Sequence, residues 1–395
     1  MPSDGGYRSV WAQRPIRRLL IASLVGRVGF AMLPLGLVLF ATGQLDSTVE
    51  AGGLVAAFGV ASAAAPLRGR VVDRAGSRAL VAFAVACALG LVGLYAAGVH
   101  GAAAPPLLAL AAFTGAMTPP LGPFTRAIWG TALHDREDRR HRVFALDSAG
   151  EESALIVAPL IVGAIVALGS AGGALLVAAG GLLLGTTATA ASSLAAAVPR
   201  AGAGRAPAAR SRLPLALWLV IASLLGPGAT LGTINVAVPA LAAHTGAAAT
   251  AGLLLAALAI GTAGASLLAG RRDWRRPATQ RLVALQLGLA VTLALAAIAA
   301  ERPLLVGVVL VLAGMTVGAM FVTLYVLADV LSPQGTGTRT FAWLVTANNG
   351  GLALGAAVAG ALVASHGSAA GLWLGAACAA AGAALAAAAS RAMSA

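Results

Sequence analysis

The chain of 395 residues is built from apolar runs that are each about the 20 residues a helix needs to cross roughly 30 Å of hydrocarbon. Because these runs are continuously apolar, and do not alternate as the strands of a membrane barrel do, they predict helices. The sequence therefore predicts an all-α membrane protein with twelve transmembrane helices. They lie at 19–42, 51–67, 79–98, 104–133, 149–169, 171–198, 213–243, 249–269, 282–300, 303–331, 341–365 and 369–390.

Composition agrees with this interpretation and excludes nucleic-acid binding. The chain is 59% hydrophobic and 10% charged, whereas soluble domains are about 45–50% apolar and about 25% charged. The net charge of +13 would suit a phosphate-binding face, but the basic residues are all arginine and lie in short clusters between apolar runs. Cys87 and Cys378 both fall in apolar runs, so no disulfide framework is predicted.

The arginines also predict the orientation of the chain. With a cytoplasmic N-terminus, all but three of the 26 arginines fall in cytoplasmic segments, and the exceptions are Arg27 and Arg126 within runs and Arg302 outside. This asymmetry is what the positive-inside rule expects. We therefore expect a multi-pass protein of a bacterial inner (cytoplasmic) membrane, with cytoplasmic N- and C-termini. The first apolar run is expected to be a retained span and not a cleaved signal peptide.

The two halves of the chain resemble one another at an offset near 200 residues. IASLVG at Ile21–Gly26 matches IASLLG at Ile221–Gly226, and Gly-Arg follows both the second and the eighth run. A duplicated six-helix unit predicts two bundles around a central cavity. The expected divisions are an N-terminal bundle at 1–198, a cytoplasmic Pro/Gly/Ala/Arg linker at 199–212 and a C-terminal bundle at 213–395.

The segment GRVVDRAGSR between the second and third runs carries the most specific pattern. It reads Gly-x-x-x-Asp-Arg-x-Gly-x-Arg, and its motif residues are Gly69, Asp73, Arg74, Gly76 and Arg78. This motif resembles the loop signature of the major facilitator superfamily, except at Val71, where that signature usually has leucine, and the chain resembles a transporter of this superfamily along its whole length. The segments 118–129, 147–163 and 340–355 resemble actinobacterial drug or metabolite exporters. The Gly-Pro of the antiporter signature is replaced by Ala158-Pro159.

The resemblance implies a gating role for this segment. Asp73 is expected to stabilise the N-terminus of the eleventh span, which begins near Thr340, because a carboxylate is favoured there. The contact would hold the two bundles together on the cytoplasmic side and favour an outward-open state. The alternative is a positively charged cytoplasmic loop with no part in gating.

Charged residues within spans are the strongest candidates for function, because they are costly in a membrane unless paired. The sequence predicts a proton-responsive ion-pair network of Arg27, Arg126, Asp147, Glu151 and Glu152. Two members have structural alternatives: Asp147 as a helix N-cap, and Glu151 in a capping box with Ser148. Glu152 is left as the favoured coupling carboxylate, with Arg27 either pairing with it or facing an anionic substrate.

Polar residues in other spans are candidates for the wall of a substrate cavity, with hydrogen bonding between helices as the alternative. They are Thr114, Thr118, Asn235, Thr323, Tyr325, Asn348 and Asn349.

The sequence thus predicts a secondary active transporter working by alternating access, with proton-coupled export of a small lipophilic compound or metabolite. The alternative is an importer or facilitator of a small organic anion. The stretch HDREDRRH lacks metal-ligand spacing, and the chain has no Walker motif, so neither an enzyme nor ATP-driven transport is expected. The expected partners are a small-molecule substrate, protons and membrane lipids, and no cofactor or metal is expected. The protein is expected to be a monomer.

Overall fold

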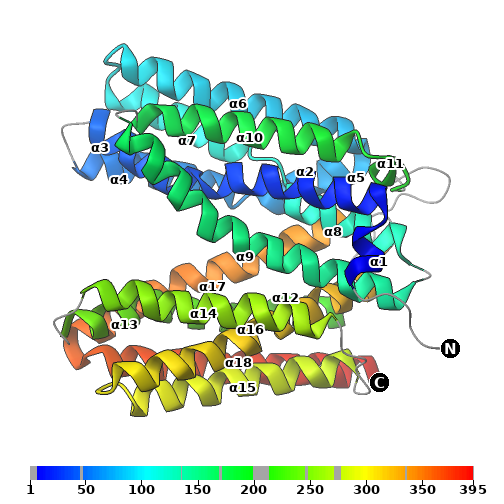
Figure 1. Cartoon of the computed structure of the whole chain (residues 1–395), viewed down its shortest axis with the longest axis vertical. Helices are drawn as coiled ribbons and strands as arrows, with labels where there is room; N and C mark the ends of the chain where they lie inside the picture. Colours follow the sequence, from blue (N-terminus) through cyan, green and yellow to red (C-terminus); the bar gives the residue numbers. More distant parts are fainter. Residues whose placement is uncertain are drawn as a thin grey trace. The chain divides into compact units, whose positions relative to one another are not determined.

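The computed structural model describes residues 7–44, 48–134, 136–168, 171–198, 213–244, 248–270, 277–333 and 336–394. All regular secondary structure in these segments is helical (Figure 1). The predicted linker 199–212 lies outside the described residues. The helices of the first half are α1 (Tyr7–Trp11), α2 (Arg14–Ala31), α3 (Leu33–Gln44), α4 (Thr48–Ser62), α5 (Ala65–Ala75), α6 (Ser77–Val99), α7 (Ala104–Ala116), α8 (Leu121–Ala132), α9 (Glu137–Ala167), α10 (Ala171–Ala190) and α11 (Ser193–Ala196). Those of the second half are α12 (Leu215–Ser223), α13 (Leu225–His244), α14 (Ala248–Ala269), α15 (Ala278–Ile298), α16 (Pro303–Leu331), α17 (Gly337–His366) and α18 (Ser368–Ser394).

The helices account for six spans in each half. Among the described residues, eleven stretches are long and apolar enough to cross a membrane, and α4 with α5 make a twelfth if a pair bent by 44° is one span. The first six are α2–α3, α4–α5, α6, α7–α8, α9 and α10, and the last six are α12–α13, α14, α15, α16, α17 and α18. The predicted all-α class with two six-helix bundles is confirmed.

The chain divides by its contacts into two units. Unit 1 holds residues 1–134, 150–210 and 334–342, and unit 2 holds residues 135–149, 211–333 and 343–395. Two helices are therefore shared: α9 begins in unit 2 and continues in unit 1, whereas α17 begins in unit 1 and continues in unit 2.

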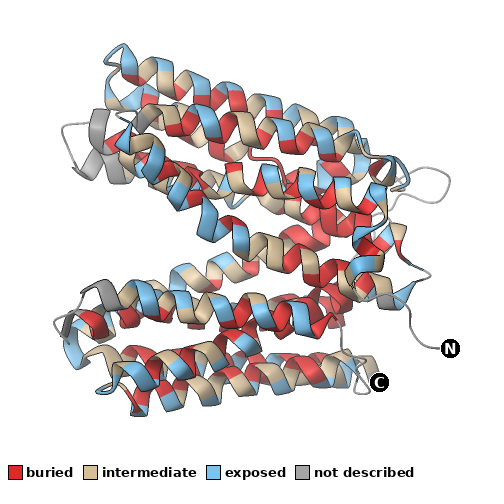
Figure 2. Cartoon of the chain, viewed as in Figure 1, coloured by how far each residue is buried: buried red, intermediate tan, exposed pale blue. Residues whose placement is uncertain are grey.

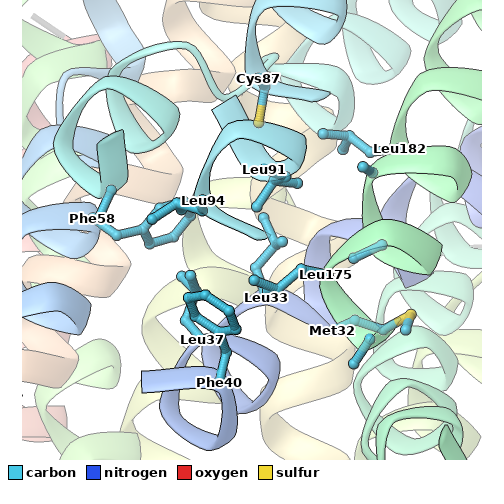
Figure 3. Close-up of a cluster of buried hydrophobic side chains, with 14 of the residues drawn as sticks. Met32, Leu33, Leu37, Phe40, Phe58, Cys87, Leu91, Leu94, Leu175 and Leu182 are labelled. Carbon is cyan, nitrogen blue, oxygen red and sulfur yellow. The ribbon is translucent and has the colours of Figure 1, made fainter. Parts of the chain in front are cut away.

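Each unit has its own apolar core. In unit 1, buried side chains from α3, α4, α6, α7 and α10 converge, as Figure 3 shows for Phe40, Phe58, Leu91, Leu94 and Leu175. In unit 2, a second core joins α13, α15, α16 and α18. Many leucines and valines of these helices are exposed, and Figure 2 shows exposed positions in pale blue along most helices. Exposed apolar side chains are expected on the lipid-facing side of a membrane helix.

Four spans are interrupted, and each interruption lies just before a proline. Pro34 follows the break between α2 and α3, Pro66 that between α4 and α5, and Pro227 that between α12 and α13. Pro119 and Pro120 end the break between α7 and α8. Proline lacks the N–H that bonds the carbonyl four residues earlier, and its ring crowds that carbonyl. Pro159 lies inside α9 without interrupting it.

Two helices extend further into polar sequence than hydropathy predicts. Helix α9 begins at Glu137, not at 149, so Asp147 and Ser148 lie in its interior. The interpretations of Asp147 as an N-cap and of Ser148–Glu151 as a capping box are therefore wrong. Helix α5 continues to Ala75, so most of the GRVVDRAGSR motif is helical and only Gly76, with φ of 70°, separates α5 from α6.

Close packing of α2 on α10 yields the first prediction. A Cβ on Gly29 would lie 2.5 Å from the backbone nitrogen of Leu182 and 2.8 Å from the carbonyl oxygen of Ala178. We expect Gly29→Ala to push the two helices apart and to lower the free energy of unfolding by about 1–3 kcal/mol. Thermal unfolding in detergent measures the change.

Gly180 on α10 supplies the matched control, because a Cβ there has nothing within 4 Å. We expect Gly180→Ala to leave the melting temperature unchanged or to raise it. Equal melting of the two variants would contradict the close contact.

Candidate functional site

Asp73 binds the first turn of α17 through both of its carboxylate oxygens. The backbone N–H of Thr338 donates to Oδ1 at 3.0 Å, and that of Arg339 donates to Oδ2 at 2.9 Å. Since α17 begins at Gly337, these N–H groups have no acceptor within their own helix. The carboxylate satisfies both and lies at the positive end of the helix dipole.

The glycines of the motif explain how α5 reaches this position. A Cβ on Gly69 would lie 3.0 Å from Cα of Arg339 and 3.1 Å from the carbonyl oxygen of Thr338, so only glycine lets the backbones approach this closely. Gly76 takes the positive φ that ends α5 and starts α6. Arg74 and Arg78 are exposed. The structure thus brings Gly69 and Asp73 onto α17, and the two arginines lie on the surface of unit 1.

Arg126 and Glu151 form an ion pair between α8 and α9, within unit 1. Nη2 of Arg126 donates to Oε2 of Glu151. The Arg126 side chain is 1% exposed, while that of Glu151 is 39% exposed. Helix α8 is buried over most of its length (Figure 2), so Arg126 is removed from water except at its partner. A buried arginine of this kind is destabilising unless its charge is compensated.

Arg27 lies beside this pair. A Cβ on Gly122 would be 3.8 Å from Nη2 of Arg27 and 3.9 Å from Nη1 of Arg126, so both guanidinium groups flank the same glycine. Arg27, on α2, is also buried. Two guanidinium groups are therefore held close together in the interior of unit 1, and Glu151 pairs with that of Arg126.

The other two members of the predicted network are placed differently. Glu152 follows Glu151 on α9 and is partly exposed. Asp147 is 2% exposed and lies in the part of α9 that belongs to unit 2. The structure therefore brings Arg27, Arg126 and Glu151 together, with Glu152 next to them in sequence, and it assigns Asp147 to the other unit.

A ladder of contacts at the start of α9 was missed by sequence reasoning. Arg140 Nη1 donates to Oδ2 of Asp329 at 3.2 Å, and one turn further along both helices the ring centroids of Phe144 and Tyr325 are 6.3 Å apart. Residues four apart lie on one face of a helix, and this spacing within each helix is the only signal of the ladder in the sequence. Sequence reasoning missed it because residues 134–148 lie between two predicted spans, whereas α9 already begins at Glu137.

The seven candidate cavity residues fall into three kinds. The hydroxyls of Thr114 and Thr323 donate to carbonyls of their own helices, and that of Thr118, in the break after α7, donates to the carbonyl of Gly115. Tyr325 packs between Phe144 and Phe321, with centroids 6.3 and 5.9 Å away. The amides are the most accessible: Asn235 and Asn349 are exposed, and Asn348 donates to Asn349 at 3.4 Å.

In the part of the chain that is described, no group of three or more His, Cys, Asp or Glu could hold a metal.

Comparison with known proteins identifies relatives of this architecture. The pattern of the Major Facilitator Superfamily matches residues 19–338. No curated protein matches the sequence.

Among solved structures, a bacterial homologue of the iron transporter ferroportin in an outward-facing state is 14% identical, with a TM-score of 0.75 over 96% of this chain and 100% of that one. The E. coli fucose:proton symporter FucP is 14% identical, with a TM-score of 0.67 over 95% and 98%. The human organic anion transporter MFSD10 (TETRAN) is 18% identical, with a TM-score of 0.64 over 94% and 98%. At these identities the likeness shows a shared fold.

The contact between Asp73 and α17 gives a prediction for stability. We expect Asp73→Ala to leave the N–H groups of Thr338 and Arg339 without an acceptor and to lower the free energy of unfolding by about 1–3 kcal/mol. Asp73→Asn keeps one carbonyl acceptor but loses the charge, so its effect should be smaller. Unfolding in mixed micelles, followed by tryptophan fluorescence, measures both changes.

Arg74→Ala is the control, because Arg74 is the next residue on α5 and its side chain is exposed. If Asp73→Ala unfolds with the same free energy as Arg74→Ala, the two hydrogen bonds contribute nothing to stability.

Proposed function

The chain belongs to the Major Facilitator Superfamily and is a membrane transporter, not an enzyme, and we propose that it works as a proton-coupled secondary transporter that exports a small lipophilic compound or metabolite. Transport would proceed by alternating access in a monomer with cytoplasmic termini, in a bacterial inner membrane. The arginine asymmetry of the sequence supports this orientation. The two six-helix bundles would be joined by the cytoplasmic linker 199–212.

The ion pair of Arg126 and Glu151 is the observation that carries this proposal. Both residues lie in membrane-spanning stretches, where an ionisable side chain is a functional candidate by default. Protonating the glutamate removes its charge and leaves Arg126 close to Arg27 with no compensating anion from that pair. Binding of a proton would therefore change the electrostatic energy of this part of unit 1. If that change differs between the inward-open and outward-open conformations, proton binding shifts their populations and the proton gradient drives transport.

The two adjacent glutamates have different roles in the proposal. Glu151 bonds Arg126 directly, so it links the proton to the arginine pair. Glu152 is the carboxylate that the sequence favours for coupling, and it has the same charge one position further along α9. The two variants Glu151→Gln and Glu152→Gln separate the two roles.

The coupling proposal is tested in inside-out vesicles with an imposed proton gradient and a panel of lipophilic compounds. We expect the wild type to accumulate a compound and to release protons. We expect Glu152→Gln to abolish accumulation driven by the gradient, because a glutamine cannot carry the proton. We expect Glu151→Gln also to slow exchange without a gradient, because it removes the partner of Arg126.

Glu301→Gln is the matched control, since Glu301 is exposed in the turn between α15 and α16. Transport that is equally fast with and without a gradient, in the wild type and in both variants, would reject coupling. The protein would then be a facilitator and the glutamates structural.

A second candidate function is transport of a small organic anion. The position of Arg27 and Arg126 on either side of Gly122 supports it, because two buried guanidinium groups favour an anion between or beside them. The human relative is described as an organic anion transporter.

We expect Arg27→Gln to reduce uptake of an organic anion at least tenfold, in keeping with the loss of one charge-assisted contact of about 1.5–3 kcal/mol. Arg27→Lys should retain part of the activity, because it keeps the charge but not the planar fork. Arg18→Gln, an exposed arginine on the same helix, is the control. Uptake that is unaffected by Arg27→Gln would reject an anion site here.

A further inference from the structure

Three prolines in unit 1 remove hydrogen-bond donors from two spans. In a continuous helix the N–H of each residue bonds the carbonyl four residues earlier. Pro66 therefore leaves the carbonyl of Ser62 without its usual donor, and Pro119 and Pro120 do the same to Gly115 and Ala116. Such carbonyls are costly within a membrane-spanning stretch, where water is scarce.

A single buried side chain, Arg68, supplies these carbonyls with donors. Its Nη2 donates to the carbonyl of Ser62 at 2.7 Å, and its Nη1 donates to those of Gly115 at 3.2 Å and Ala116 at 3.1 Å. A longer bond of 3.4 Å reaches the carbonyl of Ala61. The carbonyl of Gly115 accepts in addition from the backbone N–H of Thr118 at 3.3 Å and from its hydroxyl at 2.8 Å. Arg68 thus bonds the three carbonyls that lie four residues before the prolines, on two different helices.

We propose that Arg68 is a positioning residue whose guanidinium group replaces the N–H donors missing at Pro66, Pro119 and Pro120, and thereby holds α5 and α8 in the orientations that place Asp73 and Arg126. Arg68 itself is on α5, one residue before Gly69 and five before Asp73. Helix α8, which carries Arg126, starts directly after the break at Pro119 and Pro120. Asp73, which bonds α17, and Arg126, which pairs with Glu151, are therefore each carried by a helix whose orientation Arg68 would fix.

The geometry requires arginine at this position. Carbonyls at the ends of α4 and α7 are bonded at the same time by the two arms of one planar group, and only guanidinium presents donors in such a rigid fork. The two helix ends are close because Gly115 packs on the backbone of Phe58, where a Cβ would clash. A lysine has one ammonium group and a shorter reach.

Hydrogen–deuterium exchange, read by mass spectrometry in lipid nanodiscs, tests this proposal without a substrate. Arg68→Met removes every donor but keeps an apolar side chain of similar length. We expect it to speed exchange of the N–H groups of Thr338 and Arg339 by about tenfold, because their acceptor, Asp73, is no longer held in place. Helices of unit 2 such as α15 should exchange as in the wild type.

A double-mutant cycle with Asp73→Ala separates positioning from general destabilisation. If Arg68 acts through Asp73, the double variant should exchange at 338–339 no faster than Asp73→Ala alone. Arg70→Met, an exposed arginine two residues along α5, is the control and should exchange as the wild type does. Exchange at 338–339 that is unchanged in Arg68→Met, or that rises equally in every helix, would overturn the proposal.

Arg68→Lys keeps the test decisive if Arg68→Met does not fold. The ammonium group lacks the planar fork that bonds both helix ends through separate arms, so we expect exchange at 338–339 about threefold faster than in the wild type, between the wild type and Asp73→Ala. Exchange identical to the wild type would overturn the proposal. Neither outcome depends on whether the protein couples transport to protons.

Discussion

Backbone polar groups that lose their helical partner within a membrane need another one, and this requirement accounts for the contacts that Arg68 and Asp73 of α5 make with other helices. Three prolines free carbonyl groups at the ends of α4 and α7, and Arg68 donates to them. The start of α17 has the opposite deficit, two free N–H groups, and Asp73 accepts from both. One charged side chain of each sign on α5 therefore completes the hydrogen bonding of three other helices. Unit 2 shows a weaker form of the same response: Pro227 frees the carbonyl of Ser223, which lies 3.5 Å from Nε2 of the buried Gln286.

The charged residues inside the spans follow from electrostatics in a poorly solvated interior. Arg126 is almost fully buried and tolerates this position because Glu151 compensates its charge. Arg27 lies close to the same group, so the net charge at Gly122 depends on the protonation of a glutamate. A site with this property responds to protons or to an added anion, and these are the two functions that we propose. The variants of Glu151, Glu152 and Arg27 distinguish them because each changes a different charge.

The fifth and the eleventh spans, α9 and α17, each begin in one unit and continue in the other. The first turns of α9 belong to unit 2 and those of α17 to unit 1, and in each case charged residues make the attachment. Arg140 of α9 pairs with the side chain of Asp329, whereas the backbone of α17 bonds the side chain of Asp73. The corresponding spans of the two halves therefore share this division between units. The bonding groups differ, because α9 uses a side chain and α17 uses its backbone.

The sequence by itself determined the fold class, the number of spans and the family motif, because the length of an apolar run and the spacing of glycine and aspartate are local properties. It also placed Arg27, Arg126, Glu151 and Glu152 inside predicted spans, because their positions within apolar runs are likewise a local property. Helix boundaries in polar sequence were not predicted: the first turns of α9 are charged, so hydropathy does not reveal them, and the alternative of Asp147 as an N-cap fails because Asp147 lies inside the helix. The pairing of Arg126 with Glu151 and the four bonds of Arg68 were decided by tertiary structure alone. They join residues of different helices, and only the packing of those helices decides which free carbonyl or carboxylate an arginine can reach.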